Sequence, residues 1–135
     1  MASWKLELQP PPKEARAFEL WLQPAAGRIL FEDVRAYAIG RIEPELSVEA
    51  RSAAQKGVDD ALYGLMMVID GVTGALKNDT QSVSLSVIAR LVNHEPEGIA
   101  AELDLRDGDG MCMGYHGWLE GDYGENPVAS EKPEV

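Results

Sequence analysis

The chain has 135 residues, of which 45% are hydrophobic and 26% are charged. These values are ordinary for globular proteins and exclude a wholly disordered chain, and the length suits one domain with its own core. The net charge of −11, from 23 acidic and 12 basic residues, argues against nucleic acid and anionic membranes as partners, because binding phosphates requires clustered Lys and Arg.

The negative charge is concentrated near the C-terminus. Eight acidic and two basic residues lie from Asp104 to Val135. A positively charged protein is therefore the electrostatically favoured partner. Cys112 is the only cysteine, which excludes an intrachain disulfide, and the first residues lack the apolar run of a signal peptide. We expect a cytoplasmic protein, and the acid-interrupted segment 57–76 does not predict a membrane span.

The first predicted elements are two short strands. LELQP at 6–10 is repeated as LWLQP at 20–24, and each copy alternates leucines with period 2 before a proline. This pattern predicts a hairpin with strands over 3–9 and 16–23. The segment EARAFELWLQ also fits two and a half helical turns, so a helix remains an alternative there.

Two helices are predicted next. Apolar residues at helical spacing indicate a short amphipathic helix over 29–42, followed by Pro44. Ser47 is a suitable N-cap for a long helix over 47–77. Large apolar residues follow one line along this helix at steps of four and three: Val58, Leu62, Leu65, Ile69, Val72 and Leu76.

Alternating residues predict three further strands. The segments 82–92 and 99–106 each have one apolar and one polar face, and NHEPEG joins them as a hairpin. We interpret MCMGYHGWLEG, residues 111–121, as a fifth strand beside 99–106. The order is strand–strand–helix–helix–strand–strand–strand. It predicts a two-layer α+β domain over 1–120, with a mainly antiparallel sheet of about five strands carrying one long and one short helix on one face. Residues 121–135 are expected to form an acidic, flexible tail.

A second line on the long helix contains only small residues. Gly57, Gly64 and Gly71 lie seven apart, and each glycine inside a helix costs roughly 1 kcal/mol relative to alanine. A neighbouring backbone could approach closely along this flank. The neighbour is either another segment of the same chain or the same helix of a second copy. The second alternative makes the three glycines an interface and the protein a homodimer.

The outer face of the same helix suggests a polar site. Asp59, Tyr63, Met67 and Asp70 point away from both lines, and they predict either a carboxylate and phenol site or an ordinary helix exterior. Three helical turns separate the two carboxylates by about 16 Å, which exceeds the spacing of paired catalytic carboxylates.

The segment DGDGMCMGYHGW at 107–118 concentrates reactive side chains. DGDG begins like a calcium loop, but methionines and Cys112 occupy the following ligand positions, so a turn is the better interpretation. Acidic surroundings should raise the pKa of Cys112, which argues against a nucleophilic thiol assisted by His116. We therefore predict no metal, no cofactor and no catalytic residue. His116 and Trp118, beside many acids, fit a binding surface instead.

No phosphate-loop, dinucleotide, hydrolase or zinc-ribbon motif occurs in the chain. The leading hypothesis is a non-catalytic protein-interaction module, of the kind represented by immunity-type inhibitors or adaptors, whose acidic C-terminal half meets a basic protein. The alternative is a small-molecule-binding protein or small enzyme with a pocket between sheet and helices. In that case Asp59, Tyr63, Asp70 and His116 would supply its polar groups.

Overall fold

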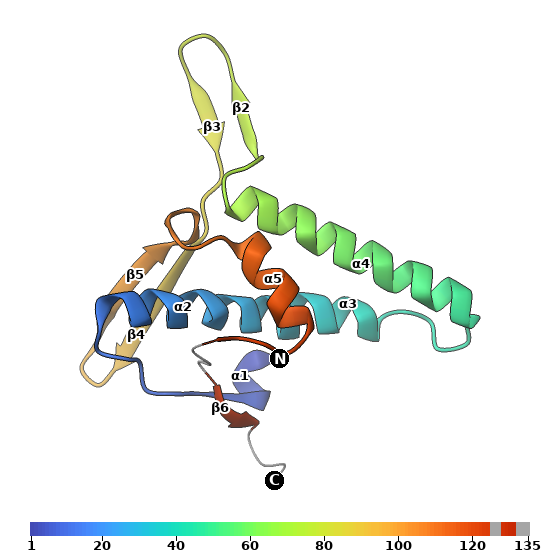
Figure 1. The fold of residues 1–135 in the computed structure, drawn as a ribbon, viewed down its shortest axis with the longest axis horizontal. Coiled ribbons are helices and arrows are strands. Elements are labelled where there is room, and N and C mark those ends of the chain that lie inside the picture. The colour runs from blue at the N-terminus through green and yellow to red at the C-terminus, as the bar shows by residue number, and fades with distance from the viewer. Residues whose placement is uncertain (125–127, 132–135) are drawn as a thin grey trace.

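The computed structural model describes residues 1–124 and 128–131, and it has a mixed α+β architecture (Figure 1). Its elements are, in chain order, α1 (Ala2–Lys5), β1 (Leu6–Leu8), α2 (Ala15–Leu30), the π-helical segment η1 (Phe31–Arg35), α3 (Ala36–Gly40), α4 (Val48–Ile69), β2 (Ala75–Lys77), β3 (Ser82–Ser84), β4 (Ile88–His94), β5 (Glu97–Asp104), the 3-10 turn η2 (Leu105–Asp107), α5 (Met111–Leu119) and β6 (Val128–Glu131).

One long helical run replaces the second predicted strand. The segments α2, η1 and α3 continue into one another, because the residues at both junctions keep helical backbone angles. The carboxylate of Glu14 starts the run by accepting hydrogen bonds from the amides of Arg16 and Ala17. The predicted strand over 16–23 is therefore wrong, and its helical alternative is confirmed. Of the first predicted hairpin only β1 is a strand, and it pairs with β6.

Burial explains why the helix continues through this segment. Trp21, Leu22 and Gln23 are all buried on α2, and Pro24 is buried within the helix. A proline here removes one backbone hydrogen bond, and the packing of its neighbours outweighs that loss. The helix expected over 29–42 is confirmed as the later part of this run, which ends at Gly40.

The helix α4 starts where the sequence predicts and ends earlier. The hydroxyl of Ser47 accepts a hydrogen bond from the amide of Ala50 at 3.2 Å, which confirms the N-cap. The helix stops at Ile69 rather than at 77. Gly71 has a φ of +76°, and the amide of Val72 turns back to donate to the carbonyl of Met67. A left-handed glycine at this position is a common helix stop.

The core lies mainly between helices, with Ala89 of β4 and Leu103 of β5 packed against it. Its buried residues come from α4, η2, α5 and the segment that follows α5: Leu62, Met66, Ile69, Leu105, Met111, Tyr115, Trp118 and Tyr123. Ala26 and Leu30 of α2 pack against this core. Figure 1 shows α2 beside α5. Only part of the predicted apolar line on α4 is in this core, since Leu65 is 37% exposed and Val72 and Leu76 lie beyond the helix.

The predicted fifth strand is a helix. Met111, Tyr115 and Trp118 are the buried residues of α5, and their spacing of four and three places them on one helical face. The alternation that suggested a strand spans only six residues, Met111 to His116, and over so short a run alternation does not exclude a helix. The expectation of a strand over 111–121 is therefore wrong.

The strands form three separate two-stranded antiparallel sheets within the described residues, so the expected single sheet of about five strands is not present. The hairpin of β4 and β5 confirms the predicted pairing of the two alternating segments, with Arg90 opposite Glu102 and their side chains 3.1 Å apart. The predicted strand over 82–92 is divided, because its first residues form β3 and pair with β2 instead.

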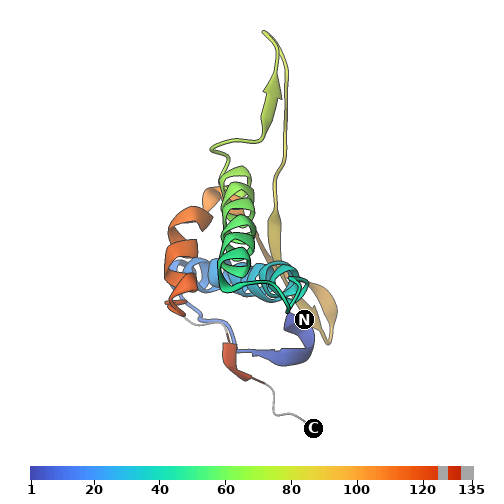
Figure 2. The ribbon, with the colours of Figure 1, turned by 90° about the vertical axis from the view of Figure 1, so that its right-hand side faces the viewer.

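The pair β2–β3 projects from the body. We call residues 71–88 the arm, and every one of them is exposed (Figures 1 and 2). At the other end of the molecule, β1 pairs with β6. Tyr123 belongs to the core although it follows residue 120, while 125–127 and 132–135 of the expected tail lie outside the described residues. No helix in the described part of the chain has the length and hydrophobicity needed to cross a bilayer.

Two glycines of the small-residue line predict opposite effects on stability. Gly64→Ala should raise the free energy of unfolding by roughly 1 kcal/mol, because no neighbouring atom lies within 4 Å of the added methyl group and alanine favours the helix. Gly71→Ala should lower it by about 1 kcal/mol or more, because alanine disfavours the left-handed backbone. The added carbon would also lie 2.6 Å from Nε of Arg106.

Urea unfolding of both variants in dilute solution measures these differences. A loss of stability in Gly64→Ala would show that the flank of α4 is occupied by another segment, which contradicts this structure.

Candidate functional site

The N-terminus of α5 is anchored to the C-terminus of α4. One carboxylate oxygen of Asp70 accepts a hydrogen bond from the amide of Met111 at 2.6 Å, and the other accepts one from the amide of Cys112 at 2.9 Å. These amides have no partner within their own helix, and a negative charge at a helix N-terminus is favourable. Asp70 therefore acts as an N-cap supplied by a distant residue.

The turn before α5 is anchored to α2. The side-chain oxygen of Gln23, which is buried, accepts a hydrogen bond from the amide of Asp109 at 2.8 Å. A side chain at Gly108 would place its first carbon 2.6 Å from that same oxygen. The carboxylate of Asp109 pairs with Arg16 through two hydrogen bonds of 2.8 Å. The glycine and aspartate of DGDG therefore serve the docking of this turn on α2.

No metal centre is evident in this turn. In the part of the chain that the structure describes, no three His, Cys, Asp and Glu side chains are grouped so that they could hold a metal ion.

Asp59 belongs to a second polar cluster that ties three elements together. Its carboxylate lies 2.7 Å from Nε of Arg35 on η1, and the hydroxyl of Tyr115 on α5 donates to the same oxygen at 3.0 Å. The hydrogen bond from Arg35 holds the pKa of Asp59 below its usual value. Burial, together with the hydrogen bond to Asp59, raises the pKa of Tyr115 to about 12. The cluster joins a fixed carboxylate to a neutral phenol.

Tyr63, His116 and Cys112 lie near one another between α4 and α5. The ring of Tyr63 is 5.6 Å from that of His116 and 5.8 Å from that of Tyr115. Burial raises the pKa of the Cys112 thiol, and the carboxylate of Asp70 raises it further. The direction agrees with the sequence-based argument, although burial is the larger cause. A protonated, half-buried thiol is a poor nucleophile.

Trp118 lies in the core, with 5% of its surface exposed. Its ring stacks on Tyr123 at a centroid separation of 6.1 Å, and the guanidinium of Arg28 lies 3.8 Å from the centre of the Tyr123 ring. Gly27 and Gly114 allow this arrangement, because a side chain at either position would overlap the Trp118 ring. Trp118 is thus a packing residue in the isolated chain.

The structure brings together most of the predicted binding residues without giving them a shared cavity. Asp59, Tyr63 and Asp70 lie along the side of α4 that α5 covers, with His116 at the edge of this contact, and Met67 is partly buried. Each aspartate serves an internal contact. Sequence reasoning missed Arg35, whose pairing with Asp59 across 24 residues has no local signature.

The small-residue flank of α4 is open. No neighbouring atom of the described residues lies within 4 Å of a methyl group built at Gly57 or Gly64, so no described segment packs closely against the chain at these two positions. Gly71 lies beyond the helix and serves as its stop. For Gly57 and Gly64 an interface between copies stays a prediction.

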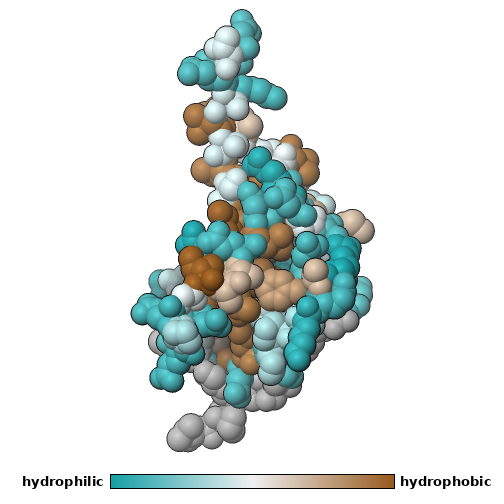
Figure 3. Space-filling view, turned by 90° about the vertical axis from the view of Figure 1, so that its left-hand side faces the viewer, coloured by the Kyte–Doolittle hydropathy of each residue, from teal (hydrophilic) through white to brown (hydrophobic). Residues whose placement is uncertain are grey.

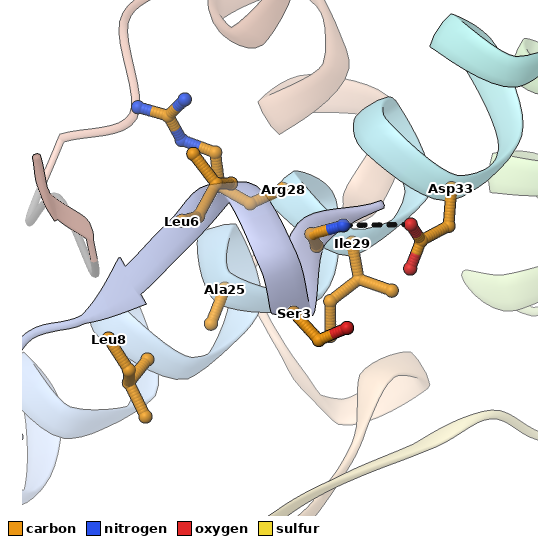
Figure 4. A pocket seen from close by; sticks show the side chains of 8 residues that line it. Ser3, Leu6, Leu8, Ala25, Arg28, Ile29 and Asp33 are labelled. Atoms are coloured by element: carbon orange, nitrogen blue, oxygen red, sulfur yellow. Dashed lines mark hydrogen bonds between the residues drawn. The ribbon is translucent and has the colours of Figure 1, made fainter. Parts of the chain in front are cut away.

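Two apolar pockets lie beside α2. One, of about 310 Å³, is lined by residues of α1, β1 and α2; Figure 4 shows Leu8, Ala25 and Ile29 around it, with the amide of Ala2 bonded to Asp33 at its edge. The other, also of about 310 Å³, lies between α2 and residues 87–91. Neither pocket is lined by the predicted polar groups Asp59, Tyr63, Asp70 and His116.

Exposed apolar residues recur along the arm, among them Val72, Leu76, Val83 and Leu85. Figure 3 shows brown side chains on the arm below its teal tip. Leu76 on β2 lies opposite Val83 on β3, and the alternation continues through Leu85 and Val87. Side chains of paired residues lie on the same face of a sheet. Leu76 and Val83 therefore share one exposed face of the β2–β3 pair, which we call the apolar face of the arm.

Comparisons with protein families, with curated proteins and with solved structures found no match to this chain.

The Asp59 cluster predicts a specific dependence of stability on pH. Because the folded state lowers the pKa of Asp59, its contribution is present above the unfolded value of about 4 and is lost as the pH falls through the folded value. Asp59→Asn should lower the free energy of unfolding at pH 7 by about 1.5–3 kcal/mol, the range for a hydrogen bond to a charged group. The difference from the unsubstituted chain should shrink below about pH 4.

Unfolding in denaturant at several pH values measures this dependence. Asp60→Asn is the matched control, because Asp60 bonds only to the exposed Lys56 among the described contacts and should show no comparable loss. A difference for Asp59→Asn that stays constant down to pH 2.5 would rule out this role for the carboxylate.

Proposed function

We propose that the chain is a non-catalytic protein-interaction module that contacts protein through the apolar face of the arm. The observation that carries this proposal is the exposed pair Leu76 and Val83 on one face of the β2–β3 pair, followed along the chain by the exposed residues Leu85 and Val87. Exposed apolar surface is unfavourable in water, and an isolated two-stranded hairpin is at best marginally stable. A partner that covers this face would remove both penalties.

The polar residues of the body support a non-catalytic function. Asp70 is occupied in capping α5, and Asp59 is occupied by Arg35 and Tyr115. The raised pKa of Cys112 keeps its thiol protonated at neutral pH. The packing of α5 explains why these side chains lie where they do, and no catalytic role is needed to explain their positions.

The acidic surface of the body supports a more specific proposal: the chain acts as an immunity-type inhibitor or adaptor, and its partner is a positively charged protein. The segment 104–124 has five acidic residues and one basic residue. Asp107, Glu120 and Asp122 are exposed on the turns that flank α5. Charge of one sign attracts an oppositely charged protein at long range and weakens with added salt.

A ligand-binding function is the second candidate, and the apolar pockets beside α2 favour it. Their volume of about 310 Å³ is at the lower end of the range for small-molecule sites. The ligand would be mainly apolar, because the pocket between α2 and β4 is lined mostly by Trp21, Leu22, Ile29 and similar side chains. This function makes no use of the arm.

Photo-crosslinking from the arm separates the two candidates. A benzophenone side chain is introduced at Val83 in one variant and at Ser84 in the other, in the full chain and in its native host. The two positions are adjacent and face opposite sides of β3. An interaction module predicts protein adducts from position 83 and few from position 84.

Two outcomes would contradict the proposal. One is the absence of any protein adduct from position 83. The other is the same set of adducts from both positions, since a specific contact depends on the face.

A further inference from the structure

We infer that the partner of the arm is a second copy of this chain, and that two arms meet through their apolar faces. This inference rests on the proposed function and names the occupant of its surface. The four apolar side chains at the proposed contact are well exposed: Leu76 by 79%, Val83 by 69%, Leu85 by 63% and Val87 by 41%. None of them belongs to the core of the body.

The arm has two chemically different faces. Leu76 and Val83 face each other on one side of the β2–β3 pair, whereas the pairs Ala75–Ser84 and Lys77–Ser82 lie on the other side. Beyond β3 the sequence continues to alternate, with Ser86 between the exposed residues Leu85 and Val87. One dry and one wet face are typical of a ribbon that packs on another layer.

The charge distribution favours a second copy of the chain as the layer that packs on the apolar face of the arm. Residues 71–88 contain one Lys and one Asp, so the arm has no net charge in a chain whose net charge is −11. Two acidic bodies repel each other, whereas two neutral arms do not. A basic protein would gain little charge attraction from the arm, and an anionic membrane would be repelled by the rest of the molecule.

The shape of the molecule allows this contact. The arm projects from the end of α4, away from α2 and α5 (Figures 1 and 2). Two arms can therefore pack face to face, about 10 Å apart, while the bodies remain at the outer ends. A contact between identical patches is two-fold symmetric and closes as a dimer. The dimer would present two acidic bodies to a basic partner.

Light scattering of the full chain over a range of concentrations tests the inference. The unsubstituted chain should have the mass of a dimer, whereas Val83→Asp and Val83→Lys should each be monomers. Like charges buried at the contact should raise the dissociation constant of the dimer by about 100-fold or more. A mixture of the two variants in equal amounts should recover the dimer mass, because opposite charges then meet.

Two controls keep the result interpretable. Ser84→Asp adds the same charge to the opposite face and should remain a dimer. A thermal melt of each variant shows whether the body is folded, and we expect it to be, since Val83 lies outside the core.

Three outcomes would overturn the inference. The first is an unsubstituted chain that is monomeric at about 100 μM, well above the dissociation constant of a specific dimer. The second is a dimer that Val83→Asp and Val83→Lys leave intact, which would place the contact elsewhere, as on the flank at Gly57 and Gly64. The third is a pair of variants that stay monomeric when mixed. A monomeric chain whose position 83 still crosslinks to another protein would refute the second copy and leave the proposed function standing. A monomer without protein adducts would refute both.

Discussion

The two hydrogen bonds that the amides of Met111 and Cys112 donate to the carboxylate of Asp70 are the interaction on which the rest of the structure depends. It fixes the start of α5 at the end of α4, while Gln23 fixes the preceding turn to α2. Once both contacts form, one face of α5 enters the space between the two long helices. Helix α5 supplies three of the buried core residues, Met111, Tyr115 and Trp118, and Tyr115 also completes the Asp59 cluster.

The same anchoring divides the molecule into a packed body and an unpacked arm. Helix α4 ends at Ile69, and the chain beyond Gly71 leaves the body. Among the described strands, β2 and β3 pair with each other alone. Polar groups that resembled a site in the sequence are used inside the body, where they hold helices together. Apolar groups that resembled a core are left on the arm, and we therefore seek the function there.

The sequence predicted those elements whose signals are local. Ser47 marks the start of α4, and strict alternation marks the hairpin of β4 and β5. The sequence-based prediction was wrong where a short pattern fits both the period of a strand and that of a helix, as in α2 and α5. There the choice depends on long-range burial of Trp21 and Trp118, which no short window contains. The candidate site was predicted by residue type alone, because the partner of Asp70 lies about forty residues away.

Amide hydrogen exchange in dilute solution tests the anchoring of α5 most directly. The first amides of a helix normally exchange rapidly because they lack intrahelical partners. We predict that the amides of Met111 and Cys112 exchange more slowly than those of Leu76 and Lys77 on the arm, by a factor on the order of 1000 or more in rate. The reason is that the amides of Met111 and Cys112 become accessible only when the body unfolds. Exchange of Met111 and Cys112 within about tenfold of the arm amides would contradict the account.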